Sequence, residues 1–383
     1  MNDMHMDDTR QMLADSARTY VARAYDAGTR SASLDHPHAC APQRWQEFAD
    51  MGWLALPFSE PDGGLGGSLA DLCAVAEELG TALVVEPFVP CVVLGAGLLA
   101  DLAPDAVRAC WVPGITQGRQ RLAFAGWEPG SGFDVAAIRC TAHPDGPRMR
   151  LQGDKCLVPG GAGVDGYLVS ARLQGSDDVG VFLLAPGTSG LTVTPQALYD
   201  GQLTVALAMQ EAQADGALMI GTAAAVLPRL QQAVDRAMLA HCAETVGSMQ
   251  RAFDITLDYL KTRKQFGRVI AANQVVQHRL VDLYVEIAEA RAITHAAAEV
   301  LDGADRALHR RHSAAARICV ARTARHVWEE CVQLHGAIGM TQEYVLGQYV
   351  KRLAVACTLY GGVEDHLEIL AAQSLDSAPS TNY

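Results

Sequence analysis

Residues 262–277 combine side chains that suit a large anionic ligand. They read Thr-Arg-Lys-Gln-Phe-Gly-Arg-Val-Ile-Ala-Ala-Asn-Gln-Val-Val-Gln. We expect one amphipathic helix to run into Arg263, Gln265 and Phe266, to stop at Gly267, and a second helix to begin near residues 273–274. A guanidinium, amides and an aromatic ring would then meet at a helix–helix junction able to hold a flat, anionic cofactor. The alternative is an ordinary helical hairpin with polar residues at its turn.

The helices on either side of this junction show the apolar periodicity of a bundle. Apolar residues recur at spacings of three and four before the turn, after it, and in a third long segment: Val246, Met249, Phe253, Leu257 and Leu260; Leu280, Leu283, Ile287 and Ala290; Ile318, Val327, Cys331 and Leu334. Such stripes predict antiparallel helices that pack around a shared core.

The rest of the chain changes character twice. Residues 1–112 are mostly helical in pattern, with helices expected over 7–25, 42–51 and 69–79; the last has Ser68 as its N-cap and ends at Gly80. Residues 113–221 contain short β-type runs separated by glycine and proline, such as 148–152, 167–172 and 180–185. We therefore predict a multidomain α and β protein: an N-terminal helical domain (1–112), a middle β-barrel-like domain (113–221) and a C-terminal four-helix bundle (222–383).

Composition excludes several classes of function. The 383 residues carry a net charge of -13, without a basic run, which argues against nucleic acid as a partner. The longest apolar run, around residues 88–100, is interrupted and too short to span a membrane. The ten cysteines are scattered singly, so no zinc or iron–sulfur site is expected. Unpaired thiols and the acidic, polar first residues predict a cytoplasmic protein.

The ordered motifs resemble the acyl-CoA dehydrogenase family. Arg-Lys-Gln-Phe-Gly (263–267) is followed by Gln274 and then by Gln-Leu-His-Gly-Ala-Ile-Gly-Met-Thr (333–341). The glycine loop at 63–66 and Gly-Asp-Lys (153–155) match further landmarks. The resemblance covers nearly the whole chain, and residues 339–352 look like the branch found in bacterial enzymes built from two unlike subunits.

This resemblance implies FAD, bound between the β domain and the bundle and completed by a neighbouring subunit. It places Arg263 on the pyrophosphate, where a planar guanidinium forms paired, charge-assisted bonds. The other cofactor-binding residues that it implies are Gln265, Phe266, Gln274, Gln333, Gly336 and Ala337. The family usually has two consecutive glycines where this chain has Gly336-Ala337. His335, beside that turn, is expected to be structural.

The family's proton-abstracting glutamate is missing from its expected places. The aromatic–Glu–Gly turn of most members reads Leu-Tyr-Gly-Gly (359–362), so Gly361 occupies the position of the base. In a second branch the base lies earlier, at a position that falls close to Ala237, although a shifted alignment would bring Asp235 there. Glu244 is a weaker candidate, because a carboxylate on a bundle helix more often pairs with an arginine.

The flavin-ring side of the site departs from the family too. After Lys155 the chain reads Cys-Leu-Val-Pro (156–159), without the aromatic residue that normally faces the ring. Pro159 replaces a hydroxyl residue that bonds the flavin, and proline has no backbone donor. The nucleotide side is therefore better preserved than the ring side.

Three functions remain open from the sequence. The first is FAD-dependent acyl-CoA dehydrogenation in acyl-CoA catabolism, which makes a 2-enoyl-CoA and passes electrons to an electron-transfer flavoprotein. This chain would then belong to a homo- or hetero-oligomer, a dimer or tetramer. In the heteromer, a glutamate-bearing paralogue would supply the base. The second is a non-catalytic, scaffolding subunit. The third is a flavoenzyme of the same fold with different chemistry, such as flavin oxygenation.

Overall fold

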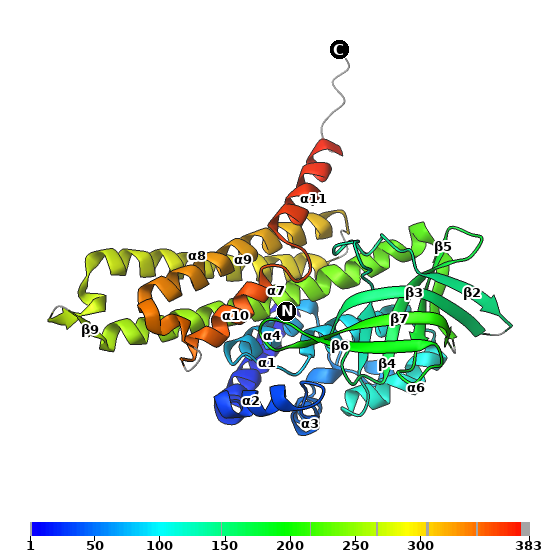
Figure 1. Ribbon diagram of the computed structural model, residues 1–383, viewed down its shortest axis with the longest axis horizontal. Helices are drawn as coiled ribbons and strands as arrows, with labels where there is room; N and C mark the ends of the chain where they lie inside the picture. Colours follow the sequence, from blue (N-terminus) through cyan, green and yellow to red (C-terminus); the bar gives the residue numbers. More distant parts are fainter. Residues whose placement is uncertain are drawn as a thin grey trace, which may run out of the picture. The chain divides into compact units, whose positions relative to one another are not determined.

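The computed structural model describes residues 2–376 except 147, 215, 266, 304–305 and 342–343 (Figure 1). These residues form two compact units. Unit 1 contains the first helix, residues 69–84 and the described residues from Met238 onward, whereas unit 2 contains Gly28–Ser68 and Val85–Ala237. None of the described helices has both the length and the apolar character needed to cross a membrane.

Unit 1 is helical. Its helices are α1 (Asn2–Ala24), α4 (Leu69–Thr81), the larger part of α7 (Ala223–Thr262), α8 (Gln274–Asp302), α9 (Arg306–His335), α10 (Leu346–Ala356) and α11 (Val363–Asp376). Two short 3-10 helices, η4 (Ile270–Ala272) and η5 (Gly336–Met340), and a hairpin of β9 (Lys264–Gln265) and β10 (Arg268–Val269) connect them. Figure 1 shows α8 and α9 running alongside each other.

The four helices α7, α8, α9 and α10 share one core, as the apolar stripes predict. Buried residues include Met249 on α7, Leu283 on α8, Val327 on α9 and Leu353 on α10. One detail of the prediction is wrong: α7 ends at Thr262, so Arg263 already lies beyond it. The second helix does begin at Gln274, with Asn273 at its N-cap position.

Two glycines allow α4 and α7 to cross at close range. A Cβ added to Gly80 would lie 2.0 Å from the carbonyl oxygen of Glu244, and one added to Gly247 would lie 1.9 Å from that of Glu77. Ser248 Oγ donates to the carbonyl of Gly80 across the crossing (2.9 Å). Gly80 therefore serves this contact as well as the end of α4, which the structure extends to Thr81.

The N-terminus of α4 is capped from a distant part of the chain. The amides of Leu69 and Ala70 donate to the two carboxylate oxygens of Asp302, at 2.8 and 3.1 Å. A carboxylate at this place satisfies free N–H groups and interacts favourably with the helix dipole.

Unit 2 holds a mixed eight-stranded sheet. Its strands are β1 (Leu122–Ala125), β2 (Thr141–Asp145), β3 (Arg148–Pro159), β4 (Gly166–Leu173), β5 (Asp178–Leu184), β6 (Leu191–Ala197), β7 (Leu203–Ala214) and β8 (Gly216–Thr222). The order is β6-β7-β3-β2-β4-β5-β8, with β1 beside β4. β4 pairs in parallel with β1 and β2, and the other pairs are antiparallel.

Short helices complete unit 2. They are α2 (Ala27–Asp35), α3 (Pro42–Asp50), η1 (Trp53–Ala55), η2 (Glu60–Asp62), the π-helical η3 (Phe88–Ala96), α5 (Gly97–Leu102) and α6 (Asp105–Thr116). Cys110 on α6 is exposed, whereas the other nine free cysteines are buried or half-buried. The predicted fold, with helices before a central sheet domain and a four-helix bundle after it, is confirmed. The exact boundaries at 112/113 and 221/222 stay predictions.

Candidate flavin and acyl-CoA site

The first predicted cofactor stretch forms an exposed hairpin at the end of α7. The amide of Arg263 donates to the carbonyl of Tyr259 (2.8 Å), and the carbonyl of Arg263 accepts from Ile270 N (3.0 Å). Gln265 pairs with Arg268 in the antiparallel β9–β10 ladder, and Gly267 turns the chain at a φ of 80°. The side chains of Arg263, Lys264, Gln265 and Arg268 are all exposed. Phe266 lies outside the described residues.

Gln274 opens α8 just after this hairpin, with an exposed side chain. The side chain of Arg263 forms no hydrogen bond or ion pair with any other residue that the structure describes. A free guanidinium beside a lysine and amide side chains is a donor set that fits phosphate oxygens.

The second predicted stretch lies at the end of α9. Gln333 is exposed on its last turn, and Gly336 and Ala337 are exposed at the start of η5. Gly336 has a φ of 67°, and a Cβ added there would meet no atom within 4 Å. The glycine is thus required by backbone conformation and leaves the surface open to close approach by a ligand.

An aromatic cluster joins the two stretches at one end of the bundle. Tyr259, one turn before Arg263, stacks on His335 with ring centroids 4.4 Å apart, and Tyr344 packs 5.2 Å from His335. His335 Nδ1 bonds to the carbonyl of Cys331 (2.8 Å), and Nε2 approaches the Tyr344 hydroxyl (3.3 Å). Burial lowers the pKa of His335. Both ring nitrogens of His335 therefore have hydrogen-bond partners within the protein, which is consistent with a structural histidine.

The residues of unit 2 that follow Lys155 do not offer the usual ring-side groups. Lys155 is itself buried, where its ammonium pairs with Glu128 (2.8 Å) and donates to Ser170 Oγ (3.1 Å). Leu157 adopts a φ of 47°, and β3 ends at Pro159. The Lys155–Glu128 pair is a structural anchor that sequence motifs alone did not reveal.

The backbone at Gly361, where the sequence comparison predicts the base position, is adapted to glycine. Gly361 has a φ of 96°, and its carbonyl accepts from Arg317 Nη2 (2.8 Å) and Nε (3.1 Å). A Cβ added to Gly361 would lie 2.9 Å from His366 Nε2, which itself bonds to the carbonyl of Tyr360 (3.0 Å). A larger side chain such as glutamate would therefore be badly accommodated at Gly361.

Glu244 is held in a polar network on α7. Its carboxylate pairs with Arg352 Nη1 (2.9 Å) and with His241 Nδ1 (3.1 Å), and Arg352 also donates to the carbonyl of Val84 (3.3 Å). Burial by itself would raise the pKa of Glu244, but the hydrogen bond to His241 and the charge of Arg352 outweigh burial and lower it. A carboxylate with a lowered pKa is a poor proton acceptor near neutral pH.

His241 is a residue of this network that the sequence analysis did not select. Its ring is 3% exposed and packs 5.5 Å from the ring of Tyr360. With Nδ1 bonded to Glu244, Nε2 is buried without a partner among the described residues. The available signal was the three-residue spacing from His241 to Glu244, which puts both side chains on one face of a helix.

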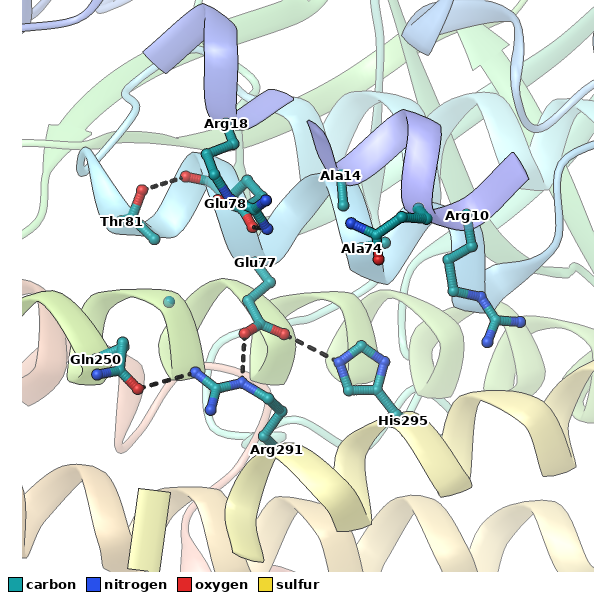
Figure 2. Close-up of a pocket in the computed structure, with 12 residues that line it drawn as sticks. Arg10, Ala14, Arg18, Ala74, Glu77, Glu78, Thr81, Gln250, Arg291 and His295 are labelled. Carbon is teal, nitrogen blue, oxygen red and sulfur yellow. Dashed lines mark hydrogen bonds and ion pairs between the residues drawn. The ribbon is translucent and has the colours of Figure 1, made fainter. Parts of the chain in front are cut away.

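A cavity of about 620 Å³ elsewhere in unit 1 is lined by residues of α1, α4, α7 and α8, and α1, α4 and α8 contribute charged side chains (Figure 2). Figure 2 shows Glu77 bridging Arg291 (2.6 Å) and His295 (3.0 Å), while Arg291 also donates to Gln250 (3.1 Å). Burial would raise the pKa of Glu77, but these partners lower it. Because the charges pair with one another, we interpret this cluster as structural.

Comparison with known proteins identifies the family. Residues 227–375 match the model of the acyl-CoA dehydrogenase C-terminal domain, and residues 7–119 match that of the N-terminal domain. A solved chain of the steroid ACAD Tcur3481–Tcur3483 is 30% identical, with 97% of this chain and 99% of that chain covered and a TM-score of 0.85. A chain of the ChsE4–ChsE5 complex from Mycobacterium tuberculosis is 25% identical, with coverage of 97% and 98% and a TM-score of 0.86.

Among curated proteins, acyl-CoA dehydrogenase IpdE2 of Mycolicibacterium smegmatis is 28% identical over 369 residues, covering 96% of this chain and 99% of that protein. The fold and these matches define an FAD-dependent flavoprotein class of oxidoreductases that act on CH–CH bonds of acyl-CoA thioesters. The chain belongs to the acyl-CoA dehydrogenase family. The predicted family and cofactor are thereby confirmed, whereas the individual site residues stay predictions.

Proposed function

We propose that this chain is one subunit of a heteromeric FAD-dependent acyl-CoA dehydrogenase, which converts an acyl-CoA to a 2-enoyl-CoA in the cytoplasm. The observation that carries the heteromer is Gly361. The usual base position has no carboxylate and a backbone conformation suited to glycine. A paralogous partner would carry the family's glutamate and supply the catalytic base in its own site. The chain's similarity to subunits of the Tcur3481–Tcur3483 and ChsE4–ChsE5 proteins supports this.

The cofactor is assigned to the exposed end of the bundle. Arg263 would pair with the FAD pyrophosphate, and Gln265, Phe266 and Gln274 would line the same pocket. Gln333, Gly336 and Ala337 would contact the nucleotide across a subunit interface. FAD held by these residues would supply the acceptor for the hydride equivalent that leaves the β-carbon of the acyl group, and an electron-transfer flavoprotein would reoxidise it.

The test is co-expression with each paralogue encoded beside this gene, followed by purification and flavin quantification. We expect a stable heteromer that contains FAD, and anaerobic bleaching of its flavin spectrum by an acyl-CoA. Replacing the partner's glutamate with glutamine should remove most of this bleaching.

The alternatives give different results in the same experiment. A heteromer that binds FAD only at sites without this chain's residues would indicate a scaffolding subunit. A homo-oligomer of this chain that oxidises acyl-CoA at full rate without a paralogue would overturn the heteromer. Oxygen-dependent substrate hydroxylation by the flavin would indicate different chemistry.

A further inference from the structure

The His241–Glu244 pair has the arrangement of an oriented general base. The Glu244 carboxylate accepts the Nδ1 proton of His241 (3.1 Å), and Arg352 holds the other carboxylate oxygen (2.9 Å). This bond selects the tautomer of the ring, because a nitrogen that donates to a carboxylate carries the proton. In the neutral ring, Nε2 is the nitrogen that carries the lone pair.

The lone pair of Nε2 has no structural use in the described part of the chain. His241 is 3% exposed, and Nε2 is buried without a hydrogen-bond partner. A buried polar atom normally finds a partner, so an unpaired one points to a ligand or a catalytic role. Two other buried histidines make more bonds or different ones: His335 uses both nitrogens. His366 Nε2 is bonded to the Tyr360 carbonyl, although its Nδ1 is also buried without a partner among the described residues.

His241 also lies beside both positions at which a base is expected. Its ring packs against Tyr360, the neighbour of Gly361. On α7 it follows Ala237 by four residues, so the two positions share a face of the helix. One imidazole therefore stands next to the two places that lack a glutamate.

We propose that His241 Nε2 is the proton acceptor of this chain's own acyl-CoA site, with Glu244 as its positioning residue. This inference rests on the proposed function. In the step, the C–H bond next to the thioester carbonyl breaks, the proton moves to Nε2, and the electron pair remains as the enolate of the thioester. The Glu244 carboxylate stabilises the imidazolium that forms. A heteromer would then contain two unlike acceptors, a glutamate in the partner and a histidine in this chain.

The experiment measures exchange of the acyl-CoA α-hydrogens with D₂O, which needs no flavin reduction. The protein is the FAD-loaded heteromer with the partner's glutamate replaced by glutamine. The probes are butyryl-, octanoyl- and palmitoyl-CoA, and mass spectrometry reports the deuterium. We expect exchange with at least one probe, a loss of about 100-fold in His241→Ala, and partial recovery when free imidazole is added.

Matched variants separate chemistry from folding. His326 forms an exposed pair with Glu286 (2.8 Å), so His326→Ala should exchange at the unsubstituted rate. Glu244→Gln should lose less exchange than His241→Ala, since the ring remains. His241→Gln preserves a polar side chain at the same place and should lose exchange even if His241→Ala does not fold.

The outcomes distinguish this inference from the proposed function. Exchange that is absent with every probe, unaffected by His241→Gln, or not recovered by imidazole would overturn the role of His241. In each of these cases the heteromer would still bleach its flavin through the partner's glutamate if the proposed function is correct. A heteromer with an intact partner that oxidises no acyl-CoA would instead overturn the proposed function.

Discussion

Arg263 is the residue on which cofactor affinity should depend most. Its exposed guanidinium has no partner among the described residues, so it is available for two bonds to one phosphate. Arg263→Ala should weaken FAD binding about 10- to 100-fold, the equivalent of losing charge-assisted hydrogen bonds. Arg263→Lys should be intermediate, because an ammonium keeps the charge without the planar fork. Fluorescence titration of the apoprotein with FAD measures both.

Arg268 provides the control for Arg263. It lies in the same hairpin, but its guanidinium already bonds to the side chain of Asn273. Arg268→Ala should therefore weaken FAD binding less than Arg263→Ala does. A larger loss of FAD affinity in Arg268→Ala than in Arg263→Ala would show that Arg263 is not the arginine that binds the pyrophosphate.

Restoring a glutamate at the usual base position should destabilise the chain. Gly361 has a φ of 96°, where an L-residue costs about 1–2 kcal/mol, and a new Cβ would press on His366 Nε2 at 2.9 Å. We expect Gly361→Glu to lower the unfolding midpoint in urea, and Gly361→Glu with His366→Ala to lower it less. A Gly361→Glu protein as stable as the unsubstituted one would show that the turn relaxes easily.

The candidate site was predictable from sequence where motifs are local. The turn at Gly267 and the start of α8 at Gln274 follow from residue order. The cofactor roles of Arg263 and Gly336 and the absence of a base at Gly361 stay predictions, and Phe266 lies outside the described residues. The role proposed for His241 did not follow from the sequence, because it depends on the ring packing against Tyr360, more than a hundred residues away in the sequence. Glu244 was predicted as a weak candidate for the base and, more readily, as a carboxylate that pairs with an arginine; the pair with Arg352 is observed.

The close crossing of α4 and α7 requires glycine at positions 80 and 247. Gly247→Ala should destabilise unit 1 by about 3 kcal/mol, because a Cβ 1.9 Å from the Glu77 carbonyl forces the helices apart. Gly97→Ala is the matched control: Gly97 is helical, and an added Cβ meets nothing within 4 Å. That change should be neutral or stabilising by about 0.5–1 kcal/mol. Chemical denaturation followed by circular dichroism measures the free energy of unfolding of both variants. Similar losses of stability in both would contradict a requirement for glycine at the helix crossing.

Helices were easier to predict than the contacts between them. Periodic apolar residues define α7, α8 and α9 closely, and the strands β3, β4 and β5 fall where short β-type runs predicted them. Residue order does not reveal that Asp302 caps α4, since that contact joins segments 232 or more residues apart. The end of α7 was misplaced by several residues because the sequence has no glycine or proline between Thr262 and Gly267 to mark it.

At the scale of the whole molecule, acid should destabilise unit 1 in two stages. Burial lowers the pKa of His335 and His366 below the usual 6.5, so both rings bind protons more readily when unfolded. The contribution of the two neutral rings to the free energy of unfolding is complete above pH 6.5. It is lost as the pH falls toward the pKa values of the rings in the folded protein. Glu77 has a pKa lowered from 4.5 in the folded protein. The protein therefore loses further stability as the pH falls below 4.5.

The measurement is the urea unfolding midpoint over this pH range. Glu77→Gln should lower the free energy of unfolding by about 2 kcal/mol near neutral pH, because the carboxylate bonds to Arg291 and His295 are lost. The same variant should lose less stability than the unsubstituted protein as the pH falls below 4.5. His326→Gln, at an exposed pair, should leave both stages unchanged. A midpoint that is constant from neutral pH to about pH 5 would contradict the contribution of the buried histidines.

The exposure of the ten cysteines allows one of them to be labelled selectively in the native protein. Cys110 is exposed on α6, whereas burial raises the pKa of Cys40, Cys91, Cys140 and Cys331 to about 12. One equivalent of maleimide under native conditions should therefore attach a dye or spin label first at Cys110 in unit 2, before it reaches the half-buried Cys156, Cys319 and Cys357. Without any engineered cysteine, energy transfer between labels would then count subunits and report the distance between copies of unit 2 in the assembled flavoprotein.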